Sequence, residues 1–220
     1  MGAWSRLAAL LAAPLLLAGC LLTPGKFTSR LTINTDRSFT YAYAGEVYAL
    51  DPDGSMRTTG TSADEQPAAT KKAEAEAKNR AIADMLSKEA GYRSVRYLGD
   101  GRFLIEYEIS GRLDHAFIYP FNLDAQAIVP FVAVELRANG TMRVKAPGFA
   151  NESKDQAGPM SGMADSGSDK LDGTFVLDTD AEIVSTNNED GAQAAGARKL
   201  LSWKVTPLTR DAPTAVLRVK

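Results

Sequence analysis

The stretch KFTSRLTINTDRSFTYAYAGEV, residues 26–47, carries the clearest structural pattern of the chain. Apolar and polar side chains alternate on both sides of the polar segment Asn34–Arg37, and this period of two is typical of strands that bury one face. The residues expected on that face are Phe27, Ser29, Leu31, Ile33, Phe39, Tyr41, Tyr43 and Val47. The sequence therefore predicts a β-hairpin that gives one face to a hydrophobic core.

From Glu65 to Ala90 the apolar residues recur at every fourth position or so, which is typical of an amphipathic helix. Pro67 would lie in the first turn, where its missing N–H costs nothing, and Gly91 would follow the helix. The stripe consists of Ala69, Ala73, Ala77, Ala81 and Met85. We expect these small side chains to pack closely on the protein's own sheet, although a partner helix could use the same surface.

Strand patterns resume after the helix, between residues 93 and 146 and between residues 174 and 219. Asn139-Gly140 lies between two apolar runs and is a strong hairpin signal. Together with the first hairpin, these patterns predict an α+β fold. We expect a mostly antiparallel sheet of about eight strands in hairpins, one main amphipathic helix and a long flexible loop.

The long loop is expected at residues 147–170, where Gly, Ser, Asp, Asn and Met are mixed without any period. Such a loop is either a mobile functional segment or a solvated linker, and we expect disorder. The segment after it has few large apolar residues and could not easily stabilise a domain alone. We therefore expect a single domain over residues 26–220, with a two-domain split at the loop as the alternative.

The first twenty residues carry an export signal. Arg6 precedes the run Leu7–Leu17, which consists of Ala and Leu interrupted only by Pro14. As a helix this run would rise about 16 Å, roughly half of a bilayer core. A basic end, a short apolar segment and small residues after it are typical of a secretory signal peptide. We expect residues 1–19 to be removed.

The segment Leu17-Ala18-Gly19-Cys20 resembles the lipobox of bacterial lipoproteins. The resemblance implies that the Cys20 thiol receives a diacylglycerol, that the new amino group is acylated with a fatty acid such as palmitate, and that residues 20–25 form a lipidated tether. Cys20 is the protein's one cysteine, so a chance match is the less attractive alternative. Leu21, in place of Asp, implies an outer-membrane anchor that faces the periplasm.

Other chemistry has weak signals. The chain has 25 basic and 27 acidic residues, so we expect no nucleic-acid partner. One cysteine and one histidine exclude multi-thiolate and multi-imidazole zinc sites. The sequence has no G-x-S-x-G motif that would supply a nucleophilic serine beside His115. We therefore interpret His115 as a solvated residue. The oxygen-rich segments 51–55, 178–180 and 187–191 are interpreted as turns, with weak calcium binding as the alternative. We expect no catalytic residue, metal or cofactor.

The apolar run from Phe117 to Phe121 looks like a connection rather than a strand. It could contact a membrane, cap a lipid cavity or meet a partner protein, or it could simply cross the core. The candidate contact surface consists of Phe117, Ile118, Tyr119 and Phe121. Trp203 alternates with Leu201 and Val205, and we expect it to anchor the core rather than to stack on a ligand.

A lipobox, a hairpin, a helix, a strand meander and a final strand with tryptophan follow one another in the sequence. The best local match comprises the strand Ile183–Ser185, the Asn/Gly-rich turn Asn187–Gly191 and the Trp203-bearing strand Leu200–Val205. This arrangement resembles that of LppM-type bacterial lipoproteins. The resemblance implies an α+β envelope domain on an acyl anchor, with a role in binding lipid or glycolipid.

The sequence thus predicts a membrane-anchored, non-enzymatic envelope lipoprotein. It would bind a lipid, another hydrophobic ligand or a partner protein in envelope assembly or maintenance, and would contact the membrane through its N-terminal acyl chains. A purely structural lipoprotein without a ligand is one alternative. An envelope hydrolase with no recognisable motif is another.

Overall fold

The structure, a computed structural model, describes residues 21–50, 68–120, 130–151 and 169–220. Within these ranges the chain forms twelve strands, one α-helix and a short 3-10 helix. The helices are α1 (Ala68–Leu86) and η2 (Pro147–Phe149). The strands are β1 (Leu21–Ile33), β2 (Ser38–Leu50), β3 (Tyr92–Gly99), β4 (Arg102–Arg112), β5 (Phe117–Tyr119), β6 (Val132–Leu136), β7 (Thr141–Lys145), β8 (Asp172–Thr179), β9 (Glu182–Thr186), β10 (Gln193–Ala195), β11 (Arg198–Val205) and β12 (Thr214–Arg218).

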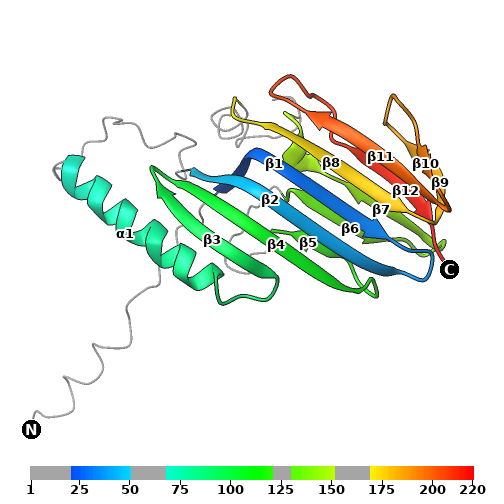
Figure 1. Ribbon diagram of the computed structural model, residues 1–220, viewed down its shortest axis with the longest axis horizontal. Coiled ribbons are helices and arrows are strands. Elements are labelled where there is room, and N and C mark those ends of the chain that lie inside the picture. Colours follow the sequence, from blue (N-terminus) through cyan, green and yellow to red (C-terminus); the bar gives the residue numbers. More distant parts are fainter. Residues whose placement is uncertain (1–20, 51–67, 121–129, 152–168) are drawn as a thin grey trace, which may run out of the picture.

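The strands form two sheets that pack face to face. The seven-stranded sheet has the order β10-β11-β8-β1-β2-β4-β3, and the five-stranded sheet has the order β5-β6-β7-β12-β9. In Figure 1 the larger sheet lies in front of the smaller one. The sheet-rich α+β class expected from the sequence fits, but the expectation of about eight strands was wrong. Among the strands beyond that number, β5 and β10 have three residues each, too few to show a period.

The hairpin predicted from residues 26–47 is confirmed. β1 and β2 pair antiparallel, with Ile33 opposite Phe39 beside the turn. All eight residues expected on the buried face are buried. The alternation succeeds here because one face of this hairpin meets the second sheet along its length and the other face meets water.

β1 begins at Leu21, five residues before the start of the predicted hairpin. Residues 21–25, which the sequence assigns to the tether, are therefore part of the strand. The pairing with β2 shifts register between Pro24 and Phe27. Gly45 lies opposite this irregularity, where a Cβ atom would come within 2.6 Å of the Phe27 Cα. The strand extension was missed because residues 21–25 do not alternate.

The C-terminal part of the chain supplies strands to both sheets. β8 pairs in parallel with β1, with Lys26–Ile33 beside Asp172–Thr179, and β11 then pairs antiparallel with β8. β9 and β12 pair with one another in the five-stranded sheet. The centre of the larger sheet thus joins the first strand to a strand near the end of the chain.

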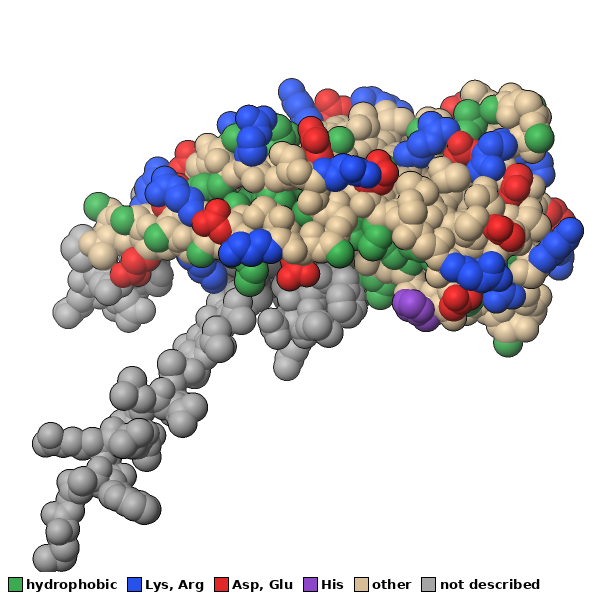
Figure 2. Space-filling model, turned by 60° about the horizontal axis from the view of Figure 1, so that its bottom comes forward, with side chains coloured by type: hydrophobic (Ala, Val, Ile, Leu, Met, Phe, Trp, Pro, Cys, Tyr) green, Lys and Arg blue, Asp and Glu red, His purple; other side chains and the backbone are tan. Residues whose placement is uncertain are grey.

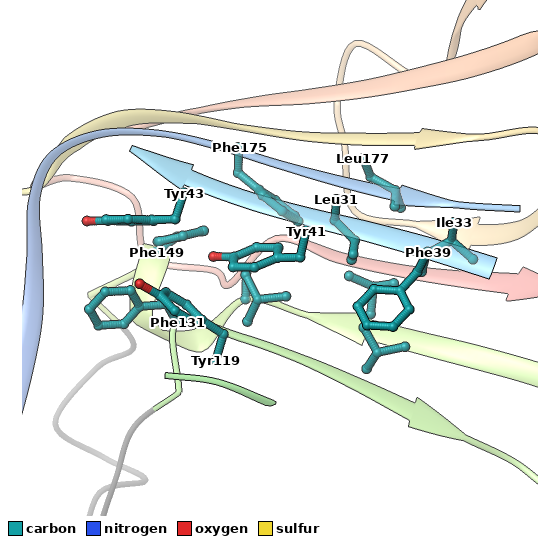
Figure 3. Close-up of a cluster of buried hydrophobic side chains, with 14 of the residues drawn as sticks. Leu31, Ile33, Phe39, Tyr41, Tyr43, Tyr119, Phe131, Phe149, Phe175 and Leu177 are labelled. Carbon is teal, nitrogen blue, oxygen red and sulfur yellow. The ribbon is translucent and has the colours of Figure 1, made fainter. Parts of the chain in front are cut away.

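The core lies between the two sheets, as Figure 3 shows. Side chains of the two layers interdigitate and are almost completely shielded from solvent. The seven-stranded sheet contributes Phe27, Leu31, Ile33, Tyr41, Tyr43, Phe175 and Leu177, and the five-stranded sheet contributes Val132, Val134, Met142, Val144, Ala215 and Leu217. This packing of two inner faces supplies most of the apolar burial in the described residues.

Phe149 corrects the prediction of a flexible excursion from residue 147 onward. Residues Pro147–Phe149 form η2, and the Phe149 ring is fully buried, with its centroid 4.3 Å from that of Phe27. The remaining part of the predicted excursion, residues 152–168, lies outside the described residues. A single aromatic residue among Gly, Ser and Asp gives no periodic signal, and so its core position was missed.

α1 packs against β3 at the edge of the larger sheet (Figure 1), but not through the predicted stripe. Ala75, Asn79 and Ala83 are buried. The predicted stripe of Ala69, Ala73, Ala77, Ala81 and Met85 is exposed instead. Alanines occupy several faces of this helix, so their spacing could not identify the buried face. No helix in the described part of the chain is both long and apolar enough to cross a membrane.

Candidate functional site

The lipobox-like residues Leu17, Ala18, Gly19 and Cys20 lie outside the described residues. The residue after Cys20 is nevertheless placed, because β1 begins at Leu21 and pairs there with Leu50 of β2. A group attached to Cys20 would therefore be joined to the sheet with no intervening residue. This short connection is the main structural constraint on the predicted anchor.

The predicted contact surface around Phe117 is a strand, not a connection. Phe117–Tyr119 form β5, the edge strand of the smaller sheet, and pair antiparallel with β6. Phe117 is partly buried and Tyr119 is buried, whereas Ile118 points outward and is 40% exposed. Phe121 lies outside the described residues. The described residues of this run therefore divide between the core and the surface, as alternate residues of a strand must.

Tyr119 stands at the centre of an aromatic cluster. Its ring centroid lies 4.4 Å from that of Tyr107, 5.0 Å from that of Tyr41 and 5.7 Å from that of Tyr43. These separations suit the tilted packing that aromatic rings prefer. Figure 3 shows Tyr119 reaching the rings of the larger sheet from the opposite layer.

Burial controls the protonation of these tyrosines. Desolvation raises the pKa of Tyr41, Tyr43 and Tyr119 well above the ordinary value of 10. The Tyr43 hydroxyl donates a hydrogen bond to the Glu46 carbonyl oxygen at 2.8 Å, and the Ser29 hydroxyl donates to the Tyr41 oxygen at 3.1 Å. At physiological pH these phenols are neutral. The cluster can therefore pack rings and donate hydrogen bonds but cannot act as a base.

The cluster reaches the surface at one edge of the sandwich. Tyr92 is partly buried and packs edge-on against Tyr107 at 4.9 Å, while the partly buried Phe117 packs on Phe39 and Tyr41. We call this region the aromatic edge, defined by Tyr92, Tyr107, Phe117, Ile118 and Tyr119. On the side of the molecule where the histidine lies, Figure 2 shows apolar side chains at the surface among interspersed basic and acidic ones.

A second constellation surrounds Asp178 on the outer face of the larger sheet. Its carboxylate accepts hydrogen bonds from Arg30 and Arg198, each at 2.5 Å, and Arg198 also donates to the Asn34 side chain. Partial burial alone would raise the pKa of Asp178, but these hydrogen bonds outweigh it and lower the pKa below its usual value.

The Asp178 constellation is structural. The sequence interpreted residues 178–180 as a turn, with weak calcium binding as the alternative. Asp178 is instead the penultimate residue of β8, and it links β1, β8 and β11. Both carboxylate oxygens already accept hydrogen bonds from guanidinium groups, so they are poorly placed to hold a cation.

The remaining sequence candidates do not converge on a reactive centre in the described ranges. His115 is exposed beside β5. The described residues include no group of three His, Cys, Asp or Glu side chains that could hold a metal ion. Residues 51–55 lie outside these ranges. Trp203 packs against the core as expected, with its ring stacked on Phe175 at 5.5 Å.

No family model matches the chain, and no curated protein matches it. Among solved structures, the chain is similar to the folded domain of the Mycobacterium tuberculosis protein LppM, determined by NMR. The match has 16% identity and a TM-score of 0.34, and it covers 91% of this chain and 92% of the LppM domain.

Proposed function

We propose that this protein is a lipid-anchored, non-enzymatic envelope protein that binds a hydrophobic ligand or a partner protein through the aromatic edge. The position of Cys20 carries the proposal. It is the chain's one cysteine, it ends a lipobox-like segment, and it immediately precedes β1. Two or three acyl chains at this position would hold the sandwich at a membrane. The absence of Asp at position 21 favours the outer membrane, with the body in the periplasm.

The aromatic edge is the preferred contact surface because the space between the sheets is already filled by side chains. The central residues of that space, including Leu31, Tyr41 and Val144, have no measurable exposure. A lipid enclosed there would have to displace them. At the aromatic edge, by contrast, Ile118 is exposed beside the partly buried Phe117. A lipoprotein that serves only a structural role remains the alternative if no ligand or partner is found.

Three carboxylates of the larger sheet are engaged in ion pairs, which favours a structural role for these side chains. Acidic side chains on the larger sheet pair with basic residues of neighbouring strands, an arrangement that is typical of structural surfaces. The pairs are Glu46 with Arg102, Glu108 with Arg93 and Asp172 with Lys204. A general acid or base would instead need a carboxylate that is free to reach a substrate.

The anchor is tested by replacing Cys20 with Ser in the full-length chain. We expect loss of radiolabelled palmitate incorporation and accumulation of the uncleaved precursor, because serine provides no thiol for the diacylglycerol. An Ala18→Gly variant, which keeps a small residue before the cut site, serves as the control and should still be labelled. Labelling of the Cys20→Ser protein equal to that of the unmodified protein would overturn the proposal.

The contact surface is tested with a matched pair of variants. Ile118 and Val184 lie on opposite edge strands of the smaller sheet and are 40% and 45% exposed. The acylated Ile118→Asp and Val184→Asp proteins would be crosslinked in membranes to detect a partner. The same proteins would be purified in detergent and examined by native mass spectrometry to detect bound lipid. We expect the Ile118 variant alone to lose co-purifying lipid or crosslinked partner. Equal retention by both variants would remove the aromatic edge from the proposal.

A further inference from the structure

Leu208 is the most exposed large apolar side chain of the described residues, at 86%. The next is Met85, at 51%. An isolated exposed leucine is common on protein surfaces and by itself signals nothing. Leu208 differs from such a leucine in two respects: a tight turn holds it away from the body, and it lies toward the end of the sandwich where β1 starts.

A tight turn holds Leu208 away from the body. The Thr209 amide donates to the Thr206 carbonyl at 3.0 Å, which closes a four-residue turn with Pro207 and Leu208 at its tip. The Thr206 amide donates in return to the Thr209 hydroxyl at 2.9 Å. The Thr209 carbonyl accepts from the Asn151 amide at 2.7 Å, and this bond ties the turn to the chain after η2. Proline at the second position favours this turn, whereas an apolar residue at the third position is unusual.

The turn lies at the same end of the sandwich as the start of β1. β11 ends at Val205, which pairs with Gly173 of β8, and Gly173 pairs with Phe27 of β1. The opposite end carries the β1–β2 turn, Asn34–Arg37. In Figure 1 the orange-red connection from β11 to β12 lies at the top and the dark-blue start of β1 lies lower, left of the centre, while the β1–β2 turn lies at the right.

The connection to Cys20 limits how far this end can be from a membrane. One extended residue spans at most about 3.6 Å. The headgroup layer on each side of a bilayer is about 5–8 Å thick. Since β1 begins directly after Cys20, acyl chains on that residue would hold the start of β1 at the level of the lipid headgroups, and Phe27, which is level with the end of β11, lies six residues further along the strand.

We propose that the turn Thr206–Thr209 inserts its Pro207-Leu208 tip into the surface of the bilayer that holds the Cys20 acyl chains. This inference rests on the proposed lipid anchor. The partner is the lipid surface itself: Leu208 enters the boundary between headgroups and acyl chains, and the exposed Arg210 lies close enough in sequence to meet lipid phosphate. The turn and the acyl chains together fix the orientation of the sandwich on the membrane.

The test uses the acylated full-length protein reconstituted in vesicles of phosphatidylethanolamine and phosphatidylglycerol. Cys20 is the chain's one cysteine, and its sulfur is blocked by the diacylglycerol, so Leu208→Cys supplies a single reactive thiol for an environment-sensitive fluorophore. Val184→Cys provides a matched probe at an apolar residue of β9, on the edge of the smaller sheet. Quenching is measured with iodide in water and with nitroxide-bearing lipids in the bilayer.

We expect the probe at position 208 to shift to shorter wavelength, to be quenched by nitroxide lipids and to be several-fold less sensitive to iodide than the probe at position 184. Equal iodide quenching at the two positions would overturn the insertion of Leu208 while leaving the anchor intact. Protection from iodide without nitroxide quenching would indicate a protein partner and would also overturn it. Failure of the anchor is distinguished separately, because the unmodified mature protein would then react with the thiol reagent at Cys20.

Discussion

The smaller sheet and α1 both pack against the larger sheet, and the two contacts bury different kinds of side chain. Opposite the smaller sheet, β1 and β8 bury large side chains such as Leu31 and Leu177 completely. Opposite α1, the residues of β3 are only partly buried or exposed. The helix contributes the small side chains of Ala75 and Ala83 and the polar side chain of Asn79 to this contact.

This difference indicates where the stability of the fold resides. In the sandwich, apolar burial is the main source of stability. In the α1 contact, hydrogen bonds take a larger share: Asn79 donates to the Tyr97 hydroxyl at 3.2 Å, and that hydroxyl donates to Glu76 at 2.8 Å. Regions with little apolar burial open at lower free energy than the core does. We therefore expect α1 and β3 to open before the sandwich unfolds.

The largest effect on the free energy of unfolding is expected from a leucine-to-alanine substitution, and its size should differ between the two regions. Leu177→Ala removes a fully buried side chain from the sandwich, and Leu86→Ala removes a partly buried one from the end of α1. We expect the first to lower the free energy of unfolding by about 2–5 kcal/mol, because it leaves a cavity, and the second by well under half as much. Urea denaturation followed by circular dichroism measures both. Equal losses of unfolding free energy in the two variants would contradict the difference between the sandwich and the α1 contact.

A second prediction concerns the outer face of the sandwich. Asp178→Asn removes the charge that both Arg30 and Arg198 contact, and we expect a loss of about 1.5–3 kcal/mol near neutral pH. The pKa of Asp178 in the folded state lies below its ordinary value of 3.8, so the stabilisation is present above that value and is lost as pH falls through the folded-state pKa. The difference in stability between the two proteins should therefore shrink in acid. A constant difference from pH 7 to the acid limit of folding would contradict this account.

A third prediction tests which face of α1 is buried. Ala83→Glu places a charged side chain at a buried position of α1 and should cost about 1–3 kcal/mol, because burial removes the charge from water. Ala81→Glu, on the exposed stripe, should change stability by less than about 0.5 kcal/mol. Hydrogen exchange of the β3 amides reports the same contrast. A larger loss of stability for Ala81→Glu than for Ala83→Glu would indicate that the stripe predicted from the alanine spacing is the buried face.

The sequence was most informative where one local pattern was sufficient. Alternation identified the β1–β2 hairpin, and Asn139-Gly140 identified the β6–β7 hairpin, because both depend on neighbouring residues and on turn chemistry. The parallel pairing of β1 with β8 is different. It joins residues far apart in the chain, and strand periodicity carries no information about which distant strand is the partner.

For the candidate site, composition was a poor guide to position. The run from Phe117 to Tyr119 looked like one apolar surface, but as a strand it sends Tyr119 inward and Ile118 outward. Asp178 looked like turn chemistry, and its arginine partners come from β1 and from β11. Leu208 drew no interpretation because one leucine in a loop has no period, and its exposure depends on the turn around it.

The parallel pairing of β1 with β8 has a consequence for how the protein is made. Arg30 and Asp178, which meet across this pairing, are separated by 148 positions in the chain. During synthesis the first strand emerges early and lacks one of its two neighbours until most of the polypeptide has been made. Closing so long a loop is slow, and an open strand edge invites wrong associations meanwhile. Any factor that shields the emerging N-terminal hairpin would thus act before the native sandwich can form.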